Sequence, residues 1–169
     1  MQTRTRISIR TIPICWLLFL GNVTAGTSPL EYAEQSFDAA GMQVEVRLPA
    51  GLELELLTDA LDGPRLLSFA ANGDLFVGSK SGKVYRLPPP YTAPQVLVEL
   101  DDYPHSVALR EGEILIAQTD GLYRAPYRPG QPRIERDSVT RLAALPGGGG
   151  HSSRTVAIGP DGRVYVSLG

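Results

Sequence analysis

The chain has 169 residues, enough for one modest globular domain. Its 18 glycines and 14 prolines favour short strands joined by many turns. A formal net charge of −2 provides no basic surface field, which argues against nucleic acid as a partner.

Residues 1–25 have the three parts of a secretory signal peptide. Three arginines form a basic start, an apolar run follows over residues 12–20, and small residues lead to an expected cleavage after Ala25. The apolar run is shorter than the roughly 20 residues that a membrane-spanning helix needs. We therefore predict a periplasmic or secreted protein with no stable membrane span after cleavage, and an uncleaved anchor is the alternative. Cleavage also removes Cys15, so the mature chain is predicted to contain no disulfide.

Residues 26–43 are interpreted as an N-terminal leader with freedom to move. Within it, residues 30–37 are compatible with one short helix that lacks a firm cap. Alternation of apolar and polar residues then predicts one leading strand at 44–48 and another at 52–56.

From Leu66 onward a structural unit repeats. Each unit contains a strand, a glycine turn and a second strand, and the turn glycines Gly73, Gly112 and Gly162 are 39 and 50 residues apart. In the first two units, a third and a fourth strand follow. The expected strands of the three units are 68–70, 74–78, 83–87, 95–100, 107–109, 113–117, 122–125, 138–142, 156–158 and 163–167.

Four short antiparallel strands in about 40 to 50 residues are typical of one β-propeller blade. The sequence therefore predicts an all-β fold, in which residues 44–169 form an incomplete β-propeller of about two and a half four-stranded blades. A β-sandwich is the structural alternative, because spaced hairpins alone do not separate the two folds. Propellers typically close with about 4 to 8 blades, so we expect this chain to be an N-terminal portion of a longer protein or a truncated product.

The residues most suited to chemistry lie near the end of the chain. Gly147–Gly150 precede His151, and histidine is the side chain most readily poised to accept a proton at neutral pH. His105 takes a similar place one blade earlier, before a first strand, with an exposed loop position as the alternative. The guanidinium of Arg154 suits a carboxylate ligand, and a structural ion pair is the alternative.

Several segments of the chain resemble the glucose/sorbosone dehydrogenase family. They are Leu48–Leu52, Pro104–Leu109, Leu145–Thr155 and Ile158–Ser167. The resemblance covers about residues 44–169 and implies a six-bladed β-propeller quinoprotein, of which only the N-terminal blades are present. It also implies export and pyrroloquinoline quinone (PQQ) as the cofactor.

By this resemblance, His151 is the general base that takes the proton of a substrate hydroxyl while hydride passes to the quinone. His105 and Arg154 become candidates for binding the cofactor. Better-studied family members have an aspartate before this histidine, whereas this chain has Gly150. Calcium is expected in full-length members with its ligands in later blades, so we predict no metal ligand within this chain.

The sequence thus predicts an exported PQQ-dependent dehydrogenase that oxidises a small-molecule sugar or polyol, present here as a portion that is inactive alone. Two alternatives remain open at this point. One is a non-catalytic propeller that binds ligands or proteins. The other is a lactonase-type propeller hydrolase, which needs a metal held by acidic and amide side chains from several blades.

Overall fold

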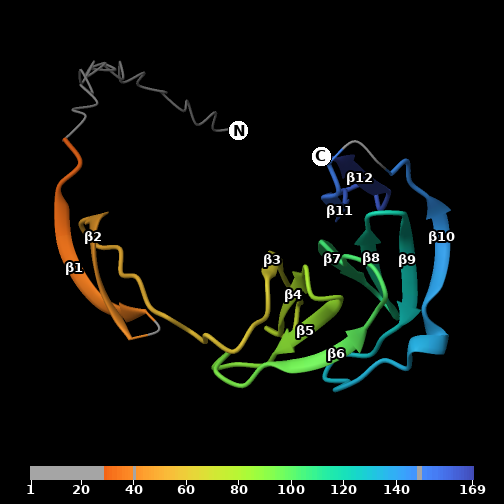
Figure 1. Cartoon of the computed structure of the whole chain (residues 1–169), viewed down its shortest axis with the longest axis horizontal. Coiled ribbons are helices and arrows are strands. Elements are labelled where there is room, and N and C mark those ends of the chain that lie inside the picture. Colours follow the sequence, from red (N-terminus) through yellow and green to blue (C-terminus); the bar gives the residue numbers. More distant parts are fainter. Residues whose placement is uncertain (1–28, 40, 148–149) are drawn as a thin grey trace, which may run out of the picture.

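A computed structural model describes residues 29–39, 41–147 and 150–169 (Figure 1). Within these ranges, twelve strands form antiparallel sheets, and one short 3₁₀ turn interrupts them. The predicted signal peptide, residues 1–25, lies outside the described residues. No helix in the described ranges has the length and apolar character needed to cross a membrane.

Two four-stranded sheets form the centre of the molecule, and in each the strands are neighbours in chain order. The first sheet contains β3 (Pro64–Phe69), β4 (Leu75–Ser79), β5 (Lys83–Leu87) and β6 (Gln95–Glu99). The second sheet contains β7 (Ser106–Arg110), β8 (Glu113–Gln118), β9 (Gly121–Pro126) and β10 (Thr140–Ala144), with the 3₁₀ turn η1 (Arg136–Ser138) before β10. These are the two full blades that the repeat predicted.

A third, two-stranded sheet follows, made of β11 (Arg154–Ile158) and β12 (Val164–Leu168). The first strands of the three sheets, β3, β7 and β11, lie side by side (Figure 1), and we call them the inner strands. They line a shared groove of about 300 Å³. The chain is therefore all-β and forms part of a β-propeller, as the sequence predicted.

The repeated turn glycines all adopt the left-handed conformation. Their φ angles are +86° at Gly73, +79° at Gly112 and +74° at Gly162. A side chain is strained at such angles, whereas glycine adopts them freely. The spacing of these glycines in the sequence consequently marks the inner hairpin of each sheet.

Strand β8 shows how the alternation of side chains builds the core. Ile114 and Ile116 are fully buried on the face that packs against the first sheet. Leu115 and Ala117 are fully buried on the opposite face, in a cluster with Val156 of β11. Because successive side chains point to opposite faces of a strand, one strand buries apolar groups between three consecutive sheets.

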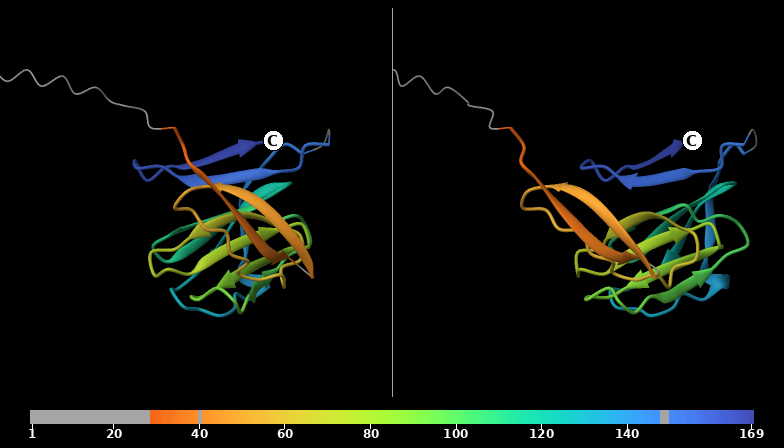
Figure 2. Two further views of the ribbon diagram at one scale, coloured as in Figure 1. Left: turned by 90° about the vertical axis from the view of Figure 1, so that its left-hand side faces the viewer. Right: turned by 60° about the vertical axis from the view of Figure 1, so that its left-hand side comes forward.

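The N-terminal segment corrects one expectation. Residues 30–37 do not form a helix, because β1 (Tyr32–Ala39) pairs in uninterrupted antiparallel register with β2 (Met42–Pro49). The leading element is therefore a hairpin rather than a single strand (orange in Figures 1 and 2). An uncapped short helix has little intrinsic stability, whereas the hairpin pairs the backbone groups that face each other along both strands.

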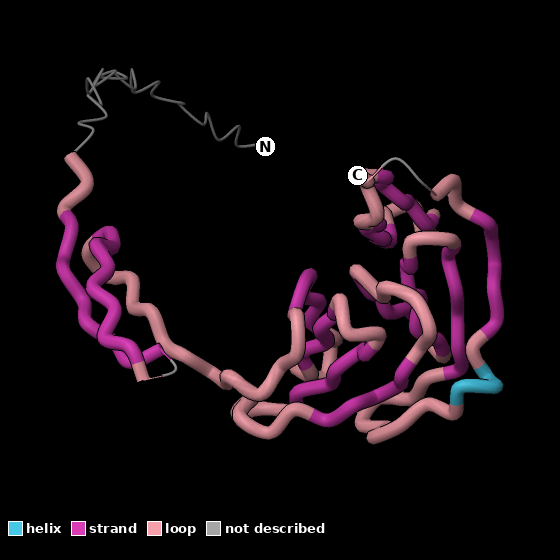
Figure 3. Tube along the Cα trace, in the orientation of Figure 1, coloured by secondary structure: helices cyan, strands magenta, loops and turns pink. Residues whose placement is uncertain are grey.

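The expected strand at 52–56 is also wrong. This stretch is irregular and is drawn as loop in Figure 3. The side-chain amide of Gln35 takes the place of a neighbouring strand: Nε2 donates to the Leu54 carbonyl at 2.6 Å, and Oε1 accepts from the Leu54 N–H at 2.9 Å. Alternation of leucine and glutamate is present in the sequence, but a strand also needs a backbone partner.

Candidate functional site

His105 lies directly before the inner strand β7, and its main chain is bound on two sides. Its N–H donates to the carbonyl of Ala117 in β8 at 3.0 Å, and its carbonyl accepts from the N–H of Leu66 in β3 at 3.3 Å. The histidine backbone is therefore fixed to its own sheet and to the preceding one. The residue is half-buried and directly precedes the inner strand β7.

The His105 ring has a defined protonation pattern. Its Nδ1 lies 3.0 Å from the carbonyl oxygen of Arg154. A carbonyl only accepts hydrogen bonds, so Nδ1 carries the hydrogen, and Nε2 is left as an acceptor in the neutral ring. Burial lowers the pKa of His105, the positive charge of Arg65 lowers it further, and the bond to Arg154 opposes this change only in part. The ring is accordingly neutral at pH 7.

An aromatic and a cationic side chain lie beside this histidine. Tyr103 packs edge-on against the His105 ring, with 5.4 Å between the ring centroids. The guanidinium of Arg65, an exposed residue of β3, lies 6.0 Å from the centroid of Tyr103. The arrangement offers a flat apolar surface, a proton acceptor and an accessible positive charge.

Ser106 connects the inner strands β7 and β11. Its buried hydroxyl donates to the carbonyl of Arg154 at 2.9 Å and accepts from the N–H of Val156 at 2.8 Å. The Arg154 carbonyl thus receives two hydrogen bonds, one from Ser106 and one from His105. Sequence reasoning missed this role of Ser106, although the residue stands next to His105 at the start of an inner strand.

The side chain of Arg154 is buried and bound to the main chain. Only 2% of the residue is exposed. One terminal nitrogen donates to the carbonyls of His151 at 3.2 Å, Ser153 at 2.8 Å and Gly169 at 3.2 Å, and the other donates to Pro146 at 2.6 Å. These N–H groups are engaged with main-chain oxygens rather than presented to a ligand carboxylate.

His151 is exposed, three residues before β11. Its carbonyl is held by Arg154, and the next residue, Ser152, accepts a hydrogen bond from the Thr119 hydroxyl at 3.2 Å. Gly150 has a φ of +82°, so the glycine in front of the histidine suits the left-handed turn there. Arg154 is the residue through which the segments of His105 and His151 are connected.

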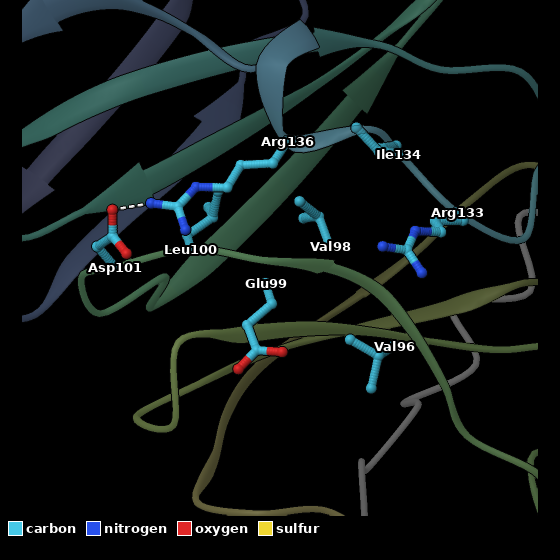
Figure 4. A pocket seen from close by; sticks show the side chains of 8 residues that line it. All are labelled: Val96, Val98, Glu99, Leu100, Asp101, Arg133, Ile134 and Arg136. Carbon is cyan, nitrogen blue, oxygen red and sulfur yellow. Dashed lines mark ion pairs between the residues drawn. The ribbon is translucent and has the colours of Figure 1, made fainter.

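A larger hollow lies elsewhere, at the outer rim of the first sheet. It encloses about 470 Å³ between β6 and the segment before β10 (Figure 4). Arg136 forms an ion pair with Asp101 across it, and Glu99 and Arg133 lie nearby. The hollow shares no residue with the inner-strand groove. Within the described ranges, no group of three or more His, Cys, Asp or Glu residues could hold a metal ion.

Gly78 of β4 sets the position of the His105 backbone. A Cβ atom at Gly78 would lie 2.5 Å from the carbonyl oxygens of both Pro104 and His105. These carbonyls belong to main chain that is fixed between sheets, so we expect Gly78→Ala to lower the free energy of unfolding by roughly 1–3 kcal/mol. Urea unfolding of the full chain measures this loss. Gly147→Ala is the matched control, because a Cβ there contacts nothing; equal stability of the two variants would contradict the prediction.

No protein-family model and no curated protein matches the chain. Several solved structures share its fold. An AA12 carbohydrate-active enzyme from Trichoderma reesei matches 64% of this chain with a TM-score of 0.57 and 20% identity. The PQQ domain of pyranose dehydrogenase from Coprinopsis cinerea matches 60% with a TM-score of 0.52 and 18% identity. An oxidoreductase from Thermus thermophilus, provisionally assigned as a glucose dehydrogenase, matches 70% with a TM-score of 0.54 and 21% identity.

The likeness to these proteins establishes the fold, which is a part of the same β-propeller. The resemblance inferred from the sequence is thereby confirmed at the level of architecture. The matched region spans only 30%, 26% and 41% of the three chains, respectively. Activity, cofactor and substrate of a whole protein are consequently matters for proposal.

Proposed function

We propose that this chain is the N-terminal portion of an exported PQQ-dependent dehydrogenase that oxidises a sugar or polyol. The observation that carries the proposal is the pair of histidines connected through Arg154 at the inner ends of β7 and β11. Two structural neighbours support the proposal. One is named a pyranose dehydrogenase PQQ domain, and the other is named a glucose dehydrogenase. The signal-peptide pattern of residues 1–25 supports export to the periplasm or the medium.

In this proposal, His151 takes the proton of the substrate hydroxyl through its exposed imidazole. When bound, PQQ supplies a quinone that accepts the hydride. The residues around His105 fit one part of such a cofactor: the exposed guanidinium of Arg65 suits a carboxylate, and Tyr103 offers a flat surface. Arg154 does not fit a direct carboxylate contact, since main-chain oxygens bind its terminal nitrogens. Calcium ligands are proposed to lie in other blades.

A non-catalytic propeller that binds a small ligand is the second candidate. Gly150 favours it, because an orienting carboxylate is missing directly before His151. Both candidates share the residues around His105 and His151 as the place of binding, and they differ in whether a bound sugar is oxidised.

The deciding experiment uses the complete polypeptide encoded by the reading frame that contains these residues. It is purified, supplied with PQQ and calcium, and assayed for reduction of an electron-accepting dye with aldoses and polyols. We expect dye reduction that requires both quinone and sugar, and none from residues 26–169 alone. Saturable quinone binding without turnover would favour the binding candidate, and absence of both would overturn the proposal.

A further inference from the structure

Arg154 touches both histidine segments, through two different parts of the residue. Its guanidinium reaches the main chain that precedes β11, and its own carbonyl reaches the blade before it. No other residue in the described part of the chain makes a hydrogen bond to both His105 and His151. The two connections can be considered separately, because one is made by a side chain and the other by a peptide group.

The guanidinium connection organises the backbone around His151. Four glycines precede this histidine in the sequence, and glycine restricts the backbone less than any other residue. Main-chain oxygens at Pro146, His151 and Ser153 converge on the terminal nitrogens of Arg154. The planar arginine fork holds several donors in fixed directions, which the single ammonium of a lysine does not do. Burial of the side chain strengthens these bonds by excluding water.

The carbonyl connection organises the ring of His105. The Arg154 oxygen accepts from Nδ1, so the neutral ring keeps its lone pair at Nε2. Ser106 donates to the same oxygen and also binds the N–H of Val156, which fixes the peptide group in place. A ring anchored in this way presents one acceptor atom, Nε2, because the hydrogen bond from Nδ1 to the carbonyl sets the tautomer.

We propose that Arg154 is a positioning residue that aligns both histidines, and that His105 accepts a hydrogen bond at Nε2 from a hydroxyl of the sugar or polyol. The catalytic meaning of this alignment rests on the proposed function. The alignment itself is a property of the chain without cofactor, and it can be tested without any turnover. It assigns Arg154 a role other than the cofactor contact that the sequence suggested.

The test is nitrogen NMR of the ¹⁵N-labelled full chain, without quinone. The chain contains two histidines, so His151→Asn identifies the signals of His105. We expect the wild-type ring to be in the Nδ1–H form at pH 7. Arg154→Met keeps the peptide carbonyl that binds Nδ1, so the Nδ1–H form of His105 should persist in this variant. It removes the guanidinium bonds to the main chain around His151, so the fast backbone motion measured at His151 should increase.

Arg163→Met is the control, because it removes an exposed arginine directly before β12; its backbone motion at His151 should equal that of the wild type. Arg154→Lys serves if the methionine variant does not fold, and it should also increase the motion at His151. A wild-type His105 in the Nε2–H form would overturn the proposal. So would an Arg154 variant with unchanged motion at His151. The NMR measurements do not depend on turnover. Failure of the dye-reduction assay would overturn the proposed function and leave the positioning role of Arg154 standing.

Discussion

Replacing Arg86 with methionine should lower the free energy of unfolding by about 3–5 kcal/mol, because it leaves a carboxylate buried without its cation. Arg86 binds Asp74 through two hydrogen bonds, with Nε at 2.7 Å and a terminal nitrogen at 3.0 Å. Its remaining terminal nitrogen donates to Gln95 at 2.9 Å. The two charged side chains are only 9% and 3% exposed. Such a bidentate pair inside the sheet is screened little by solvent.

The same pair predicts how stability depends on pH. Burial alone would raise the pKa of Asp74, but hydrogen bonds from Arg86 and Asn72 outweigh it and hold the pKa below 3.8. The folded pKa is thus lower than the unfolded one. The pair therefore contributes its full stability above about pH 4, and the contribution is lost as the pH falls through the folded pKa. In Arg86→Met the burial effect remains without the cation, so acid unfolding should begin at a higher pH.

Urea unfolding at a series of acidic pH values measures both the loss of unfolding free energy in Arg86→Met and the pH at which acid unfolding begins. Arg163→Met is the matched control, because its pair with Asp161 is exposed and 3.6 Å apart, and an exposed pair contributes about 0–1 kcal/mol. Adding Asp74→Asn to the Arg86→Met variant should restore part of the loss, since the unpaired charge is then removed. A loss below about 1 kcal/mol in the single variant, the range of an exposed pair, would contradict this account.

The sequence predicted the strands of residues 66–169 well because their signal is local. Each unit carries its own turn glycine and its own apolar strands, and Gly73, Gly112 and Gly162 all have positive φ angles. The segments at 30–37 and 52–56 were predicted wrongly because their states depend on partners outside each segment. One pairs with β2, and the other is bound by the side chain of Gln35.

The chemistry of the candidate site could be predicted only in part. The positions of His105 and His151 before inner strands follow from the repeat. The tautomer of His105 does not, because it is set by a carbonyl 49 residues away. The burial of Arg154 could not be predicted either, since the oxygens that bind it include those of Pro146, which precedes the last sheet, and Gly169, which follows it. A sequence pattern shows which side chain is present, and long-range main-chain contacts decide what it binds.

If the proposed dehydrogenase function is correct, His151→Asn should lower kcat of the quinone-loaded complete polypeptide by about 10²–10⁴-fold. Asparagine keeps a polar side chain of similar reach, but it cannot take a proton at neutral pH. Steady-state dye reduction with quinone and sugar measures this change.

His105→Asn separates a base from a residue that only binds the substrate. The Nε2 acceptor of His105 is assigned one hydrogen bond to a hydroxyl, so its loss should reduce kcat/KM by about tenfold, a smaller loss than that expected for His151→Asn. The two histidines share the contact with Arg154, and a general loss of alignment would therefore affect both variants alike. If His105→Asn shows the loss of kcat by about 10²–10⁴-fold expected of a general base and His151→Asn does not, the proton acceptor is His105, and the role given to His151 is wrong.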